Sequence, residues 1–249
     1  MKKLLVMMVS TAVMGALIGL ARAADDPKAV LDKGIKALGG EDKLGKLKAY
    51  SMKSKGKVFI QGSPNEFTME VTTQGLDHTH SRFEGEFNGQ KIEVTSVIAG
   101  DKGWSTFGDA GELDADRVAH EKRNLYLQVL PVTLSRLKDS AYKLEAAKEE
   151  QVDGKPAVGV KITGPGQKDF ILYFDKDSGL PVKLVGSAFN FMQEEVNQEV
   201  TYGGYKDFDG IKRPTKVETK HNGEKVVEAE VTEFKLLDKV DPKTFTKPD

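Results

Sequence analysis

The residues best suited to hold a metal ion are His78 and His80. Side chains two positions apart lie on the same face of a strand, so both imidazoles would point the same way. A structural zinc site needs four ligands. The chain has four histidines and no cysteine, and His120 and His221 stand alone in the sequence. The pattern favours an exposed turn or strand end, and we predict neither a metal site nor a cofactor.

The residue pattern gives little support for covalent or acid–base catalysis. The chain lacks cysteine and the Gly-x-Ser-x-Gly nucleophile elbow. The adjacent carboxylates Glu149 and Glu150, and Glu194 and Glu195, are typical of solvated faces. The Gly-Pro-Gly segment at 164–166 lacks the rest of a phosphate-binding loop and indicates a hairpin turn. We predict no catalytic residues, although Ser and Asp are numerous enough for a hydrolase site assembled in space to stay open as a hypothesis.

Large apolar side chains give a stronger signal than the polar ones. A ligand cavity needs apolar walls with few polar anchors, whereas a closed core would use the same residue types as filling. The candidates for an apolar cavity lie on predicted early strands and on one predicted helix. They are Phe59, Phe67, Met69, Phe83, Phe87, Trp104 and Phe107 on the strands, and Val118, Tyr126 and Val129 on the helix.

A second apolar group has a different context. Phe189, Phe191 and Met192 precede the acidic pair Glu194 and Glu195 and show no regular polar face. We predict an apolar loop tip that touches a membrane or an envelope protein, and a buried strand end is the alternative.

Helical spacing occurs at the start and in the middle of the chain. Acidic residues and Pro27 favour a helix start at 25–27, and the glycines at 39–40 favour its end. A shorter helix follows from Glu41. Apolar residues recur at helical spacing over 114–130, and Pro131 should break or kink that helix.

The remaining segments alternate apolar and polar residues, which is typical of half-buried strands. Turn signals at 175–181 and 207–214 separate hairpins. The last strand, 225–237, changes its apolar parity between Val231 and Phe234, which predicts a bulge or strong twist. About eleven strands are predicted in all. So large a sheet must curve, and we predict a mainly β (α+β) fold whose large curved antiparallel sheet has helices covering its concave face.

The first residues have the pattern of an export signal. A basic start at 1–3 precedes an apolar run at 4–20 and an Ala-Arg-Ala site at 21–23, so we predict cleavage after Ala23 and a single domain over 24–249. A retained membrane anchor is the alternative. Cleavage removes three basic residues, which lowers the number of Lys and Arg residues from 37 to 34. With 38 Asp and Glu residues, the mature chain has a net charge of about −4. This balance does not favour nucleic-acid binding, and the predicted location is the periplasm, with secretion as the alternative.

The order of elements resembles the outer-membrane lipoprotein carrier superfamily (LolA/LolB-like). The resemblance depends on the export signal, the Gly-Asp-Lys-Gly-Trp step at 100–104, the mid-chain helix, and the hairpin steps at 174–181 and 205–214. It implies an unclosed barrel with a helical lid over an apolar cavity that shelters acyl chains of lipoproteins or lipids. It also implies a soluble periplasmic carrier, which we expect to be a monomer. One departure is that 53–57 offers only lysines where carriers have an early-strand arginine that ties the lid shut.

Two functions from different classes follow. The first is a non-catalytic carrier of an apolar ligand. The alternative is a structural or interaction module with a filled core, acting in envelope stress or assembly. An apolar space between sheet and helices would distinguish the two.

Overall fold

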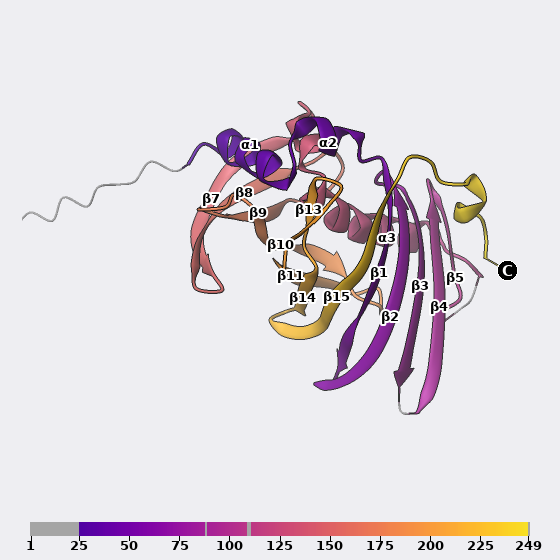
Figure 1. Ribbon diagram of the computed structural model, residues 1–249. Coiled ribbons are helices and arrows are strands. Elements are labelled where there is room, and N and C mark those ends of the chain that lie inside the picture. Colours follow the sequence, from indigo (N-terminus) through magenta and orange to yellow (C-terminus); the bar gives the residue numbers. More distant parts are fainter. Residues whose placement is uncertain (1–24, 88, 109–110, 249) are drawn as a thin grey trace, which may run out of the picture.

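The computed structural model describes residues 25–87, 89–108 and 111–248 (Figure 1). The predicted export signal, residues 1–23, lies outside these residues. In the described part of the chain, no helix is both long and apolar enough to cross a membrane.

One antiparallel sheet of 13 strands dominates the fold, in the order β6-β5-β4-β3-β2-β1-β15-β14-β11-β10-β9-β8-β7. The predicted fold class is confirmed. The predicted number of strands was too low because strands of two or three residues carry no readable alternation. The strands are β1 (Ala49–Ile60), β2 (Ser63–Gln74), β3 (His78–Phe87), β4 (Gln90–Ala99), β5 (Lys102–Ser105), β6 (Gly111–Glu112), β7 (Lys143–Val152), β8 (Lys155–Thr163), β9 (Phe170–Asp175), β10 (Pro181–Phe189), β11 (Glu195–Gly203), β14 (Lys216–His221) and β15 (Glu224–Leu237), with a separate hairpin of β12 (Lys206–Phe208) and β13 (Ile211–Arg213).

The helices begin and end where the sequence predicts. The side chain of Asp26 accepts a hydrogen bond from the backbone N–H of Lys28, and that of Asp114 accepts one from Arg117 N–H at 2.8 Å. Such caps satisfy donors that the first helical turn leaves unpaired. Pro131 cannot donate to the helical ladder, and the long helix ends two residues before it. The helices are α1 (Pro27–Leu38), α2 (Glu41–Lys46) and α3 (Ala115–Val129), with short 3₁₀ segments η1 (Leu130–Val132), η2 (Leu134–Lys138) and η3 (Pro242–Phe245).

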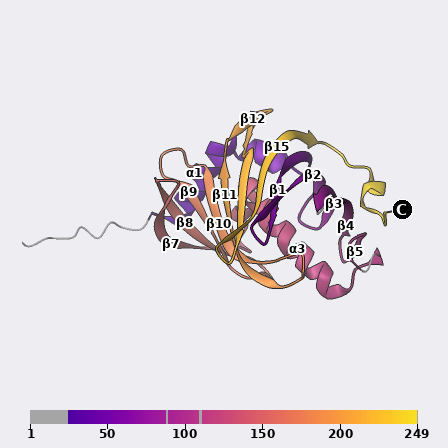
Figure 2. The same ribbon diagram turned by 90° about the horizontal axis from the view of Figure 1, so that it is seen from below.

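The sheet has an inner face, on which α1 and α3 pack, and an outer face; α2 packs on α1 and η2. Seen from below, the strands form an arch and α3 crosses its open side (Figure 2). The helix packs on β10 at one end and on β4 and β5 at the other. Fully buried side chains fill the inner face beneath the helices, among them Phe170, Leu172, Phe174 and Leu184 from the strands and Leu38 from α1.

A β-bulge interrupts the antiparallel pairing of β1 with β15. The pairing register shifts by one residue between Lys53 and Ser54, opposite Thr232, which confirms the predicted bulge. Gly56 lies three residues along β1, and a Cβ atom there would meet the carbonyl oxygen of Glu228 at 2.0 Å. Only glycine therefore allows the two strands to approach this closely.

Candidate functional site

Four of the predicted cavity residues lie together on the inner face of β2 and β3. Met69 pairs with Phe83 across the two strands. The Phe67 and Phe83 rings stack with centroids 5.3 Å apart, and the Phe83 and Phe87 rings stack at 6.2 Å. Neighbouring β4 adds Val94, which pairs with Phe83, and Ile92, which lies two residues away on the same face of the strand. We call the set the inner wall: Phe67, Met69, Phe83, Phe87, Ile92 and Val94.

The inner wall is only partly covered. Phe67 is 7% exposed, whereas the other five side chains are half-buried. The lower ends of β1 to β4 extend well past α3 (Figure 1). At the upper end, Val118 of α3 packs with Ile98 of β4. The wall is therefore an apolar surface beside the helix rather than a filled core.

Polar contacts hold α3 against the end of β10. The Asn124 side chain donates to the carbonyl oxygen of Phe189 and accepts from its N–H, both at 3.0 Å. The His120 ring stacks on the Phe189 ring at 3.5 Å, and its Nδ1 lies 3.0 Å from Oε1 of Gln193. Hydrogen bonds and a ring stack therefore join α3 to the end of β10 and to the turn that follows it.

Two buried arginines add to this attachment. Arg123 of α3 donates to the carbonyl oxygens of Ser187 and Lys168, each at 2.9 Å. Arg213 of β13 donates to the carbonyl oxygen of Val132, just beyond α3, at 3.0 Å. Burial lowers the pKa of both guanidinium groups, each of which is 5% exposed.

Sequence reasoning missed both arginines. The resemblance implied that an arginine on an early strand holds the lid helix, but the basic residues at 53–57 are all lysines. Arg213 packs over the rings of Tyr50 and Phe234, at 4.8 and 4.5 Å, so aromatic surroundings rather than a carboxylate accommodate the charge. The only signal for Arg123 was its position among apolar residues at helical spacing.

Three predicted cavity residues lie away from the inner wall. Trp104 points to the outer face, since a Cβ atom on its neighbour Gly103 would meet Ile98, Leu113 and Val118 on the inner side. The ring of Phe59 also lies on the outer face, with Lys225 Nζ 5.7 Å from its centroid. Phe107 follows β5 and is 42% exposed.

The three predicted residues of the helix are all buried. Val118 packs with Ile98 and Leu113 beside the wall. Tyr126 packs edge-on against Phe170 at 5.9 Å, and burial raises its pKa. Val129 is 2% exposed. The predicted orientation of this helix toward the sheet is confirmed, but Tyr126 belongs to the filled core.

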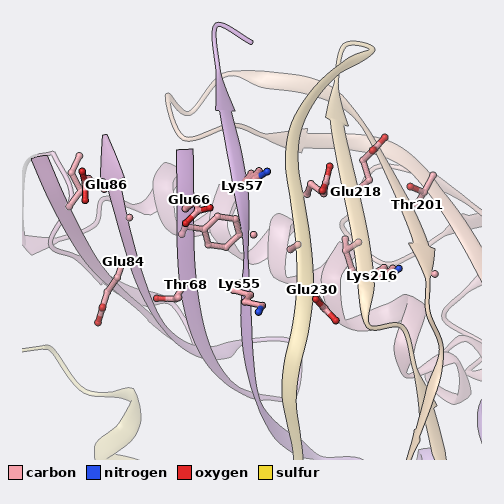
Figure 3. Close-up of a pocket in the computed structure, with 18 of the residues that line it drawn as sticks. Lys55, Lys57, Glu66, Thr68, Glu84, Glu86, Thr201, Lys216, Glu218 and Glu230 are labelled. Carbon is pink, nitrogen blue, oxygen red and sulfur yellow. The ribbon is translucent and has the colours of Figure 1, made fainter. Parts of the chain in front are cut away.

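A hollow of about 1200 Å³ lies on the outer face, across β1 to β4, β11, β14 and β15. Eight acidic and four lysine side chains line it. Figure 3 shows Lys55, Lys57, Glu66, Glu84 and Glu230 among them. An acyl chain would have to displace the water around these charges, so the outer hollow does not suit an apolar ligand despite its size.

The two candidate metal ligands do not form a site. Nδ1 of His78 lies 2.8 Å from Oδ1 of Asp77, and the His78 ring packs edge-on against Phe245 of η3. Burial lowers the pKa of His80, which favours the neutral imidazole. Among the described residues, no group of three His, Cys, Asp or Glu side chains could hold a metal ion.

Solved bacterial structures with a similar fold include the following three. A LolA superfamily protein of Nitrosomonas europaea aligns over 89% of this chain and 97% of its own, with a TM-score of 0.55 and 14% identity. The chain has the LolA-like fold. A Vibrio parahaemolyticus domain named as an outer membrane lipoprotein-sorting protein aligns over 86% of this chain and 97% of its own, at a TM-score of 0.50 and 12% identity.

A third structure, a DUF1329 family protein of Desulfovibrio piger, aligns over 89% of this chain and 98% of its own, at a TM-score of 0.53 and 12% identity. No protein-family model matches the sequence, and no curated protein matches it. At such low identities the LolA-like likeness concerns the fold alone, and ligand and partners have to be argued from the residues of this chain.

Proposed function

We propose that this protein is a non-catalytic carrier that binds an apolar ligand, such as the acyl chain of a lipid or lipoprotein, on the inner wall. The observation that carries the proposal is the continuous row of aromatic and aliphatic side chains from Phe67 to Val94 on the inner face, of which all but Phe67 are only half-buried. A solvent-facing apolar surface of this kind costs free energy unless a ligand or partner covers it.

The strength of such binding depends on cover from both sides. Ten methylene groups of an acyl chain would contribute about 4 kcal/mol to the free energy of binding if buried on one side only, and about 8 kcal/mol if buried fully. Association itself costs at least about 4 kcal/mol. The wall alone therefore retains an acyl chain poorly, and α3 has to lie over the chain for useful affinity. Such a shift would have to release the hydrogen bonds of Asn124 and Arg123 and expose buried side chains such as Val118, so ligand binding would have to supply that free energy.

The alternative function is an interaction module with a filled core. The fully buried residues between α1 and β9, such as Leu38 and Phe174, support it, because that part of the inner face leaves no room for a ligand. In that case the inner wall would be covered by a protein rather than by a lipid.

The proposed setting is the periplasm. The export signal at 1–23 supports it, with a mature single domain over 24–249 that acts as a monomer and binds no nucleic acid. Transient contact with a membrane or envelope protein fits a carrier that must collect and release its ligand.

Native mass spectrometry of protein purified from the periplasm, with solvent extraction of bound lipid, tests the proposal. The expected result is a mass adduct that disappears on extraction and returns when a long-chain fatty acid is added. Calorimetry should then show saturable binding of that fatty acid. Absence of an adduct together with absence of heat on titration would overturn the carrier and favour the interaction module.

A further inference from the structure

The turn between β10 and β11 exposes two large apolar side chains side by side in the sequence. Phe191 is 66% exposed and Met192 is 64% exposed. Among the described residues, the other large apolar side chains with high exposure are Ile60 and Phe107, each at 42% and each far from this turn in the sequence. We call Phe191 and Met192 the apolar tip.

The apolar tip is held in a defined conformation. The side-chain oxygen of Asn190 accepts hydrogen bonds from the N–H groups of Met192, at 2.9 Å, and Glu194, at 3.0 Å. The backbone of Gln193 has φ 64, in the left-handed region, and its N–H donates to the carbonyl oxygen of Asn190. Because the backbone of the turn is already ordered, burying its two side chains requires little further loss of backbone conformational entropy.

The same turn is bonded to the proposed lid. Phe189 and Gln193 flank the apolar tip, and both contact α3: Asn124 bonds the backbone of Phe189, and His120 contacts Phe189 and Gln193. A surface that binds the tip would therefore lie next to α3.

We propose that Phe191 and Met192 insert into the surface of a lipid bilayer. Two side chains offer no more than about 300 Å² of apolar area, against about 800 Å² per partner in a stable protein interface. A bilayer needs no shape complementarity, so two ordered apolar side chains at a hairpin end suffice for weak, reversible contact.

The charges around the apolar tip define the lipid class. Glu195 pairs with Lys168 at 2.5 Å, and the carboxylate of Glu194 accepts a hydrogen bond from Asn190 at 3.0 Å. Lys168 lowers the pKa of Glu195, so that carboxylate stays charged at neutral pH. The tip is thus flanked by more negative than positive charge. Contact should depend on apolar insertion into zwitterionic lipid and gain nothing from anionic lipid, and it does not depend on what the inner wall binds.

Co-sedimentation of the mature protein with phosphatidylcholine vesicles tests this. Each exposed side chain is worth roughly tenfold in affinity, so the double variant Phe191→Ser and Met192→Ser should bind about a hundredfold more weakly. Ile60→Ser is the matched control, and it should bind as the unaltered protein does. Equal binding by the double variant, equal loss in the control, or absence of vesicle binding by the unaltered protein would each overturn the proposal.

A fluorescence measurement locates the contact. In Phe191→Trp, emission should shift to shorter wavelength on addition of vesicles, after subtraction of the Trp104 signal of the unaltered protein. Binding that needs phosphatidylglycerol, or that salt abolishes, would contradict apolar insertion. Concentration-dependent dimerisation that the double variant loses would show that the apolar tip is a contact between copies of the chain. Fatty-acid binding that persists without vesicle binding would overturn this inference and leave the proposed function standing.

Discussion

Replacement of Gly56 by alanine should destabilise the protein, because the close approach of β1 and β15 depends on the absence of a side chain there. The added Cβ would lie 2.0 Å from the carbonyl oxygen of Glu228 and 2.8 Å from Cα of Ala229. Both are backbone atoms, so no side-chain rotation relieves the contact, and the strands must separate by about 1 Å. Overpacking of this kind costs typically 1–3 kcal/mol, and we expect a loss of about 3 kcal/mol in the free energy of unfolding. The melting temperature should fall by roughly 6–12 °C.

Gly45→Ala provides the matched control for this measurement. Gly45 lies in α2, and a Cβ atom there would meet nothing within 4 Å. Alanine is the better helix former, so this variant should gain about 0.5–1 kcal/mol. Urea unfolding followed by circular dichroism measures both changes. Equal stability of the two variants, or a Gly56→Ala variant as stable as the unaltered protein, would refute the conclusion that this close approach requires glycine.

Three further predictions concern the lid, its pH response and export. Val129→Asp places a charge where the side chain is 2% exposed, so thermal unfolding should show a loss of several kcal/mol, and an unchanged melting temperature would disprove the burial of this face. Burial raises the pKa of Glu121 above its ordinary 4.5, so ionisation costs folding free energy, and Glu121→Gln should be more stable than the unaltered protein at neutral pH. That difference should vanish as the pH falls below 4.5, and a difference independent of pH would contradict it. N-terminal sequencing of exported protein should begin at Ala24, whereas Met1 on the exported protein would rule out cleavage.

The sequence predicted the elements well but could not assign every side chain to a face. Alternation predicted that Phe67 and Met69 share one face of their strand and that Phe83 and Phe87 share one face of theirs, and the pairing of β2 with β3 brings the two pairs together. Trp104 lies in a strand of only four residues, whose two faces look alike in the sequence. Its face is set by pairing with Val97 of β4, a contact that the sequence does not encode locally.

The buried arginines show a second limit. A charge in an amphipathic helix ordinarily indicates a solvated position. Arg123 is buried because carbonyl oxygens of the segment before β9 and of β10, 45 and 64 residues away, accept its hydrogen bonds. The burial of Arg213 likewise depends on rings from β1 and β15. Such surroundings exist only after the sheet has formed, so neither composition nor periodicity can predict them.

Calorimetric titration of delipidated protein with a long-chain fatty acid tests the central claim most directly, when Phe83→Ser is compared with Phe59→Ser. Both positions hold a half-buried phenylalanine of the same sheet, but Phe83 lies on the inner wall and Phe59 on the outer face. Loss of the inner ring should raise the dissociation constant by roughly tenfold, because it removes about 1.4 kcal/mol of apolar contact. Loss of the outer ring should leave the dissociation constant unchanged within about twofold, since Phe59 lies on the opposite face of the sheet from the proposed site. Equal weakening by both variants, or full binding by Phe83→Ser in a protein that remains folded, would contradict binding on the inner wall.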